Sequence, residues 1–327
     1  MNLRKEGKIP RIRENPLTGE YVCFSPERAS RPADFIRTGK LRLVSPNKCL
    51  FCLNGPAYPT RIFETKNIYV IPNKFPAFVQ KPQIYNDGNN FYNNLKAFGA
   101  HEVIIRKDHD EHLPNIPIPH WVELLWVYQN RLLNYAGEPY FAYGAIFHNH
   151  GIEAGSSIAH PHSQFIVSEI LPPLIAKEVE HQKVYYEKHN ACLLCEMIRE
   201  ERQRGIRIIL ENRRYLAFMP YASRYPYEIM VIPKKHASRF ETEEEISLSH
   251  LATILHKVFG LFGSKLKDPP LNFVIHTKPY SPVIEEKNWH WHIEILPRLE
   301  HWGGYETGTG LIINALLPEK AAAFLKS

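Results

Sequence analysis

The chain of 327 residues carries the same order of local signals twice. Each occurrence opens with a C-x-x-C pair, "NKCLFC" and then "NACLLC", and closes on a His-x-His strand, "AHPHSQFIV" and then "NWHWHIEIL". Between them, each half has a strand that ends near a histidine, a helical segment and a further apolar strand. An order shared over about 110 residues predicts a duplicated α+β unit, with the strands of both copies in one sheet or two related sheets.

The elements within each copy follow from residue pattern. Eight runs are rich in β-branched or aromatic residues and are bounded by Pro, Asn or Gly, so we expect strands at 68–73, 101–107, 140–149, 163–170, 214–220, 228–234, 271–277 and 290–296. Two segments have apolar residues at helical spacing, which predicts helices at 119–137 and 243–262.

Composition excludes several classes of protein. No apolar run approaches the ~20 residues of a membrane span, and the N-terminal "MNLRKEGKIPRIRENP" lacks the apolar core of a secretory signal. We therefore expect a cytoplasmic protein without a membrane partner. The net charge of +6 is scattered along the chain, which suits an anionic substrate but does not require nucleic acid.

Four of the five cysteines form the two C-x-x-C pairs. A cytosolic setting disfavours structural disulfides, and two copies with downstream histidines favour metal over redox use or inert thiols. Two thiolates and two imidazoles make a closed tetrahedral zinc site, which is structural because no position is open to substrate. The first repeat offers Cys49, Cys52, His109 and either His160 or His162. The second offers Cys192, Cys195, His236 and either His290 or His292.

The histidine left over from each pair is free for other chemistry. Because alternate residues of a strand face one side, His160, His162 and Gln164 are expected to project together, as are His290, His292 and Glu294. Upstream, Gly151, Gly155, Ser156 and Ser157 form a small-residue loop whose backbone N–H groups can approach an anion. The same composition also fits an ordinary turn.

With these motifs in order, the chain resembles the galactose-1-phosphate uridylyltransferase family of the histidine-triad superfamily. The resemblance rests on "NPLTGEYVCFSPERASRP", "CLFC", "RKDH", the segment from "NHG" to "HPHSQ", and "GGYE", and it covers nearly the whole chain. It implies an α+β nucleotidyltransferase with an antiparallel sheet or half-barrel and flanking helices. It also implies two histidine-triad-like halves, which we place at 1–175 and 176–327, and a homodimer.

The resemblance also implies roles for particular residues. Cys49, Cys52, His109 and His160 match zinc ligands, His162 matches the nucleophile and Gln164 the glutamine that contacts phosphate. The substrate-binding positions are Asn149 and Ser157 near the phosphates, Arg28 and Arg31 near the diphosphate, Asn73 and Phe75 near the base, and Tyr305 and Glu306 near the hexose. From the residues alone, the arginines also fit a solvated loop, Phe75 fits core packing, and Glu306 fits a surface carboxylate.

The second half departs from the best-known bacterial members of the family. Those members hold a second metal with a glutamate and three histidines, whose counterparts here are Glu178, His276, His290 and His292. The added "CLLC" is more similar to the ADP-glucose phosphorylase branch. We therefore assign the second metal, zinc or iron, to Cys192, Cys195, His236 and His290.

The implied reaction is a two-step transfer of UMP from UDP-glucose to galactose 1-phosphate through a nucleotidyl-histidine at His162. The alternative is phosphorolysis of ADP-glucose, in which phosphate is the acceptor. From another class, a zinc-stabilised nucleic-acid-binding protein requires a concentrated basic face, whereas here Lys and Arg are dispersed among 34 acidic residues. A nucleotide-sugar binder without catalysis is disfavoured because His162 and Gln164 are both present.

Overall fold

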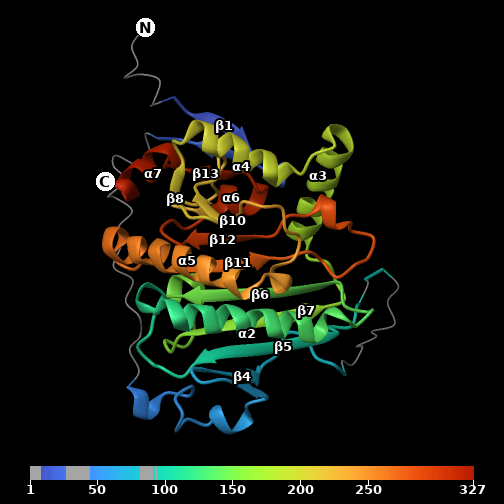
Figure 1. Cartoon of the computed structure of the whole chain (residues 1–327), viewed down its shortest axis with the longest axis vertical. Coiled ribbons are helices and arrows are strands. Elements are labelled where there is room, and N and C mark those ends of the chain that lie inside the picture. The colour runs from blue at the N-terminus through green and yellow to red at the C-terminus, as the bar shows by residue number, and fades with distance from the viewer. Residues whose placement is uncertain (1–8, 27–44, 82–90, 93) are drawn as a thin grey trace.

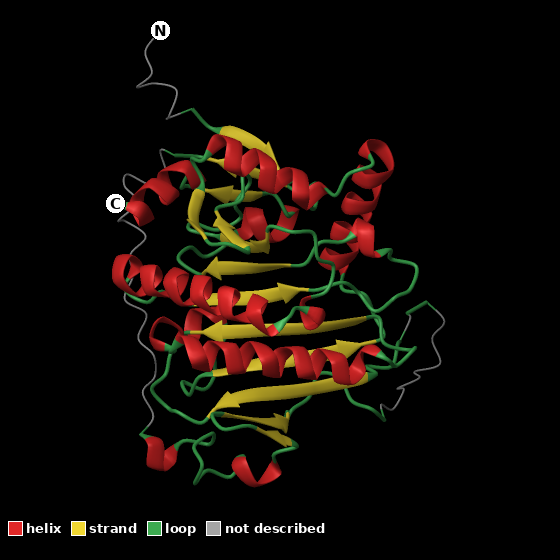
Figure 2. Ribbon diagram, in the orientation of Figure 1, coloured by secondary structure: helices red, strands yellow, loops and turns green. Residues whose placement is uncertain are grey.

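The computed structural model describes residues 9–26, 45–81, 91–92 and 94–327. Within these residues the chain forms an α+β fold around a ten-stranded antiparallel sheet, and two long helices lie across one face of that sheet (Figures 1 and 2). From edge to edge, the strands are β3 (Phe63–Glu64), β4 (Ile68–Pro72), β5 (Gly99–Arg106), β7 (His162–Ser168), β6 (Tyr143–His150), β11 (Leu271–His276), β12 (His292–Pro297), β10 (Ile229–Pro233), β9 (Tyr215–Phe218) and β8 (Ile208–Glu211). All eight predicted strands are present.

The strand order shows the duplication directly. Inside the edge strands β3 and β8, the order toward the centre is β4-β5-β7-β6 on one side and β9-β10-β12-β11 on the other, so the four predicted strands of each half lie in the sequence order 1-2-4-3. The halves meet where β6 pairs antiparallel with β11, with Ile146 opposite Ile275. The two copies thus share one continuous sheet rather than forming two separate sheets.

The two predicted helices are confirmed as α2 (Ile118–Ala136) and α5 (Glu245–Leu266), which pack side by side. Proline in the first turn of α2 is compatible with a helix start, and the helix ends at Gly137. Among the described residues, α5 is the one helix long and apolar enough to cross a membrane. Ten of its side chains, including Leu251 and Phe262, are buried in the protein, so α5 is a core helix.

Apart from β3, the strands and α-helices that were not predicted from the sequence lie on the C-terminal half. They include the helices α3 (Pro173–His189), α4 (Leu193–Arg204), α6 (Gly304–Thr309) and α7 (Pro318–Lys326). A small sheet joins β1 (Arg11–Glu14), β2 (Tyr21–Phe24) and β13 (Ile312–Asn314), with β13 parallel to β2. Glu319 accepts from Arg13 at 3.0 Å and from Arg207 at 2.7 Å, which fixes this N-terminal segment against C-terminal residues. The division at 175/176 stays a prediction.

An aromatic cluster fixes the sheet to both helices. Phe273 of β11 lies 6.4 Å from Trp121 of α2 and 6.0 Å from Phe259 of α5, between ring centroids. On the strand next to it, the His148 ring stacks on Phe273 at 5.2 Å. Because Phe273 contacts both helices and β6, it holds the centre of the sheet in place.

We predict that Phe273→Ala lowers the free energy of unfolding by about 3–5 kcal/mol, because the cavity left among these rings cannot collapse. Chemical denaturation monitored by tryptophan fluorescence and by far-UV circular dichroism measures the change. Trp126→Ala, at a 47% exposed position on α2, is the control and should cost far less. Equal losses in the two variants would contradict the assigned role of Phe273.

Candidate functional site

Two clusters of two cysteines and two histidines lie at the ends of sheet strands. In the first, Cys49 and Cys52 come from the loop before β3, His109 follows β5, and His160 directly precedes β7. Their ligand atoms all lie within 4.8 Å of one another. Neighbouring pairs are separated by 3.1 Å (His109 Nδ1 to His160 Nδ1), 3.3 Å (Cys52 Sγ to His109 Nδ1) and 3.5 Å (Cys49 Sγ to His160 Nδ1).

These separations suit a tetrahedral cation. Bond lengths of ~2.0 Å to nitrogen and ~2.3 Å to sulfur imply ligand separations of about 3.3 to 3.8 Å around tetrahedral zinc. The His160 ring is also oriented for this role, because its Nε2 donates to the Arg106 carbonyl and leaves Nδ1 toward the sulfurs. Burial lowers the pKa of His160 to about 4, so the imidazole is neutral near pH 7, as a metal ligand must be.

The second cluster repeats this geometry with Cys192, Cys195, His236 and His290. Cys195 Sγ lies 3.7 Å from His236 Nδ1 and 3.5 Å from His290 Nδ1. The outer nitrogens again donate to backbone carbonyls, His290 to Pro233 at 3.0 Å and His236 to Glu286 at 3.1 Å. A hydrogen bond between the thiols lowers the pKa of Cys192 and raises that of Cys195, so the two share one proton unless a cation stabilises both thiolates.

A third group, Glu178, His276, His292 and Glu294, is fully buried and contains no sulfur. Three of its members are the counterparts of the glutamate and histidines described above, while His290 lies with the cysteines. Its carboxylates already have protein partners, since Glu178 bonds to His276 Nδ1 at 2.9 Å and Glu294 accepts from Arg224 at 2.6 Å. Burial opposes the charge on His276, but the carboxylates of Glu178 and Glu294 raise its pKa.

A cavity of about 680 Å³ lies between the Cys49–Cys52 loop and the strands β4, β5 and β7. His162 and Gln164, two residues apart on β7, share the face that lines it. Much of the remaining wall is apolar and is made by Leu50, Phe51, Pro56, Ala57, Ile71, Val103 and Ile158. A cavity of this size, with a few polar groups on apolar walls, is typical of a small-molecule site.

His162 presents a nucleophilic nitrogen to this cavity. Its Nδ1 donates to the His160 carbonyl at 2.8 Å, which fixes the neutral tautomer and leaves the lone pair on Nε2. Burial lowers the pKa of His162, so the ring is unprotonated near pH 7. The edge of the Phe51 ring meets the imidazole at 5.2 Å between centroids and restricts its movement.

The opposite face of β7 holds this strand to the core. Ser163 points away from the cavity and hydrogen-bonds to Tyr128 of α2 and to His148 Nδ1 at 2.9 Å. The alternation expected along the strand is therefore present from His162 onward. His160 was expected on the same strand face, but β7 begins at His162 and His160 lies in the preceding turn, where it reaches the cysteines.

The other predicted substrate residues are distributed unevenly. Asn73, Phe75 and Ser157 line the cavity, and Phe75 is 80% exposed, which excludes core packing. Asn149 is bonded to Asn272 at 2.8 Å and is absent from the lining. The turn before Ser157 needs its glycines, since Gly151 and Gly155 both have φ of +85°.

Two pairs of predicted substrate residues remain, and two residues in or beside the cavity were not predicted. Tyr305 and Glu306 lie on α6, which contacts β13, and Glu306 caps its own helix by accepting from Gly303 N–H at 2.9 Å. Arg28 and Arg31 lie outside the described residues. Phe51 and His101 were not among the site residues predicted from the sequence. Alternation along β5, where Val103 lines the cavity, would have placed His101 on the same face.

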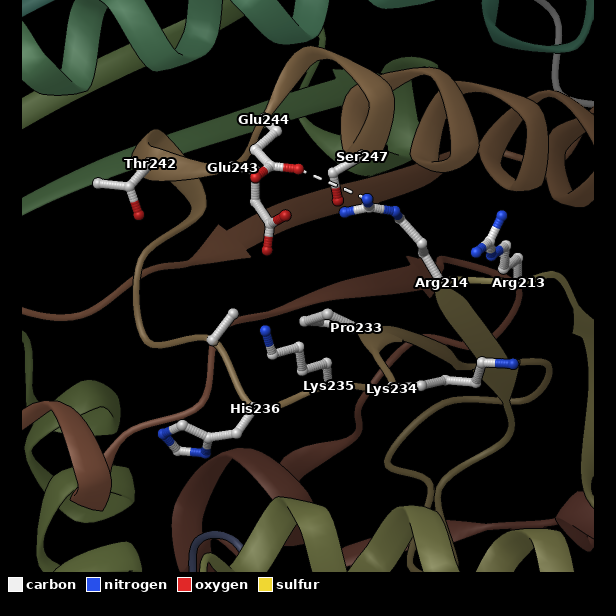
Figure 3. Close-up of a pocket in the computed structure, with 11 residues that line it drawn as sticks. Arg213, Arg214, Pro233, Lys234, Lys235, His236, Thr242, Glu243, Glu244 and Ser247 are labelled. Atoms are coloured by element: carbon white, nitrogen blue, oxygen red, sulfur yellow. Dashed lines mark hydrogen bonds and ion pairs between the residues drawn. The ribbon is translucent and has the colours of Figure 1, made fainter.

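A second hollow of about 580 Å³ lies near the start of α5 and beside His236 (Figure 3). It is lined by several cations, but Lys234 pairs with Glu211 at 2.7 Å, and Arg214 faces Glu244 at 3.5 Å. Neither His162 nor Gln164 reaches it. We assign it no part in catalysis.

Comparison with known proteins places the chain in a class of enzymes. Structurally, it is similar to an ADP-glucose phosphorylase from Arabidopsis thaliana with bound ADP-glucose, at a TM-score of 0.82 and 29% identity over 98% of this chain and 99% of that chain. A solved uridylyltransferase gives a TM-score of 0.77 and 25% identity over 97% of each chain. These likenesses and the site define a transferase.

The family follows from sequence. Models of the galactose-1-phosphate uridyl transferase N-terminal and C-terminal domains match residues 2–172 and 178–324, so the chain belongs to this family. It is 30% identical to the ADP-glucose phosphorylase of Arabidopsis thaliana over 98% of this chain and 93% of that protein. It is 28% identical to the galactose-1-phosphate uridylyltransferase of Thermotoga maritima, over 96% of this chain and 97% of that protein.

The buried histidines beneath the site predict acid sensitivity. Burial lowers the pKa of His148 well below the 6.5 of an exposed histidine, so below pH 6.5 the unfolded chain binds more protons than the folded one. The contribution of neutral His148 to the free energy of unfolding is then fully present above pH 6.5 and falls as the pH drops, by up to about 1.4 kcal/mol per pH unit for one such group.

Melting temperatures at pH 7.5, 6.5 and 5.5 should show a smaller fall for His148→Gln than for the parent protein. His301→Gln, at an exposed position, should leave the fall unchanged, and an unchanged fall in His148→Gln would contradict the assignment.

Proposed function

We propose that the protein transfers UMP from UDP-glucose to galactose 1-phosphate through a nucleotidyl-histidine on His162. One observation carries this proposal. The His162 Nδ1 hydrogen bond to the His160 carbonyl leaves an unprotonated Nε2 facing a cavity of about 680 Å³. The membership of the chain in the galactose-1-phosphate uridyl transferase family supports the choice of substrates.

Each half of the reaction displaces one group at phosphorus. The His162 Nε2 lone pair forms a bond to the α-phosphorus, and the bond from that phosphorus to the β-phosphate oxygen breaks, so that glucose 1-phosphate leaves with the electron pair. The Nδ1–H bond to the His160 carbonyl stabilises the charge that develops on the ring. In the second half, a phosphate oxygen of galactose 1-phosphate attacks the same phosphorus and His162 leaves as neutral imidazole.

Such a reaction depends on alignment and charge stabilisation more than on acid–base catalysis. We propose that Gln164 and Ser157 donate to the non-bridging oxygens, and that Arg28 and Arg31 neutralise the diphosphate. Asn149 is proposed to act near the phosphates, because Asn272 Nδ2 joins its side-chain oxygen to the Ala154 carbonyl of the turn. Asn73 and Phe75, which line the cavity, are proposed to contact the base.

We propose that the protein is a cytoplasmic homodimer. Within each chain, the two histidine-triad-like halves divide near residue 175. Tyr305 and Glu306, the proposed hexose contacts, do not line the cavity of their own chain. Their helix α6 contacts β13 of the small sheet, whereas the cavity lies between the Cys49–Cys52 loop and the strands β4, β5 and β7. These two residues therefore act on substrate only from a second copy.

We propose that both Cys2His2 clusters hold Zn²⁺ with a structural role. The ligands are Cys49, Cys52, His109 and His160 in the first cluster, and Cys192, Cys195, His236 and His290 in the second. Sulfur ligands and near-tetrahedral spacing favour Zn²⁺ at both, with iron as the alternative at the second. A closed four-ligand site supplies no chemistry to the substrate, so its contribution is to hold the Cys49–Cys52 loop over the cavity.

A second candidate reaction is phosphorolysis of ADP-glucose, with phosphate as the acceptor. It is favoured by the second Cys2His2 cluster, which resembles the ADP-glucose phosphorylase branch, and by the 30% identity to the Arabidopsis thaliana protein of that name. Both reactions pass through a nucleotidyl-histidine on His162. They differ in the base of the nucleotide and in the acceptor of the second step.

Intact-mass spectrometry separates the two candidates. Incubation with UDP-glucose should add one UMP to the protein, and galactose 1-phosphate should then remove it, while ADP-glucose and phosphate should be poor replacements. The adduct should be absent in His162→Ala and normal in His120→Ala, at a histidine bound to Glu111 outside the cavity. An adduct that persists in His162→Ala contradicts the mechanism. Labelling by ADP-glucose alone refutes uridylyl transfer and supports the second candidate.

Elemental analysis tests the metals. The purified protein should carry two equivalents of zinc per chain, one for each Cys2His2 cluster. Cys52→Ser and Cys195→Ser should each lose one equivalent and several degrees of melting temperature, because each removes one thiolate ligand. Cys23→Ser, at the cysteine outside both clusters, is the matched control and should retain both equivalents. Full zinc content in Cys52→Ser or Cys195→Ser would refute the assignment of that ligand.

A further inference from the structure

His101 is a polar residue beside the cavity that the proposed mechanism does not use. It lies on β5, two residues before Val103, and its ring is partly buried. Its Nε2 is 2.8 Å from Oε1 of Gln164, the glutamine proposed to contact phosphate. The two residues come from neighbouring strands, since Val103 pairs with Gln164 across β5 and β7.

A backbone donor fixes the state of the His101 ring. The Ala77 N–H group donates to His101 Nδ1 at 3.2 Å, and a backbone nitrogen can only donate. Nδ1 must therefore be unprotonated, and in a neutral imidazole the proton then lies on Nε2. Burial lowers the pKa of His101, which keeps the ring in this neutral form near pH 7.

The tautomer in turn fixes the amide of Gln164. Because His101 Nε2–H is a donor, it must meet the oxygen of Gln164 and not its nitrogen. Asn73 does not compete as an acceptor, because its Oδ1 accepts from Phe75 N–H at 2.9 Å. Its Nδ2 lies 3.1 Å from His101 Nε2, and because both nitrogens carry hydrogen in this tautomer, that approach is not a hydrogen bond. Among the described residues, the Gln164 amide nitrogen donates to no protein acceptor, which leaves it available to a ligand in the cavity.

The second half of the chain provides an internal comparison. Met230 pairs with Glu294 as Val103 pairs with Gln164, so the position of His101 is taken there by Glu228. Arg224 bridges the two carboxylates, at 3.0 Å to Glu228 and 2.6 Å to Glu294. The side chains at these two strand positions are therefore linked in both halves. Only the pair beside His162, His101 with Gln164, is uncharged and oriented by a hydrogen bond from the His101 ring.

We propose that His101 is a positioning residue that holds Gln164 with its amide N–H groups toward the phosphate oxygens during transfer at His162. This inference rests on the proposed function. It predicts that an amide at position 101 can replace the imidazole if it supplies a donor where Nε2 stands. It also predicts that His101 has no effect on the chemical step when the Gln164 amide is absent.

A double-mutant cycle on the rate of nucleotidyl-enzyme formation, measured in single turnovers by intact mass, tests the inference. Gln164→Ala should lose about 10²-fold or more, as expected for one lost donor to the transition state, and His101→Ala about 10-fold or more. Adding His101→Ala to Gln164→Ala should cost less than about 3-fold. His101→Gln should recover to within about 3-fold of the parent rate, and His120→Ala is the control for loss of a histidine elsewhere.

Two results would overturn the inference while the proposed function stands. One is a parent-like rate in His101→Ala. The other is an equal loss from His101→Ala with and without Gln164, which would mean that His101 acts by itself or supports only the fold. If the parent protein forms no adduct with UDP-glucose or ADP-glucose, the proposed function fails instead. The ¹⁵N shifts of the His101 ring then decide separately, because a proton on Nδ1 refutes the orientation of Gln164 and a proton on Nε2 supports it.

Discussion

The pairing of β6 with β11 is the contact on which the arrangement of the whole molecule depends. It joins the two copies of the unit at their innermost strands, so that ten strands form one surface. Because both copies place their long helix on the same face, α2 and α5 cover that face together and bury Phe273 between them. The cysteine loop, His162 and Gln164 are left to the other face of β7, away from Ser163 and its contact with α2.

The duplicated unit has two equivalent positions for a site. The charges of the side chains on the two neighbouring strands distinguish these positions. Beside His162 the neighbouring strands carry His101 and Gln164, which are both neutral and leave a donor free. The other half carries carboxylates at these positions and fills the space between them with Arg224. A phosphate would meet two buried carboxylates there that already share Arg224, so we propose that the second copy supports the fold rather than binding a nucleotide phosphate.

Much of this could be predicted from the sequence, because period and spacing are local properties. Runs of β-branched and aromatic residues bounded by Pro, Asn or Gly identified the eight central strands, and the repeated C-x-x-C and His-x-His motifs indicated two clusters. The choice of His162 as the histidine left free came from the family resemblance. The helix α3 was missed because its largely polar surface gives no clear apolar stripe. The helix α4 was missed because its apolar face is short, with Leu193, Leu194 and Ile198 as its buried apolar residues. His101 was missed for another reason. Its partner Gln164 is 63 residues away, and the proton that links them is fixed by the backbone of Ala77, which no side-chain pattern records.

Phe51 lies inside the C-x-x-C loop, one residue before Cys52, and its ring rests against His162. Tyr69 holds the Phe51 carbonyl by a hydrogen bond of 2.6 Å, so the ring is fixed from the sheet as well as from the cysteines. In the proposed mechanism, the same loop that provides two sulfur ligands also places the Phe51 ring beside the phosphorus–nitrogen bond. Loosening the loop would first shorten the lifetime of that bond against water, turning a transferase into a slow hydrolase while the rest of the sheet remained folded.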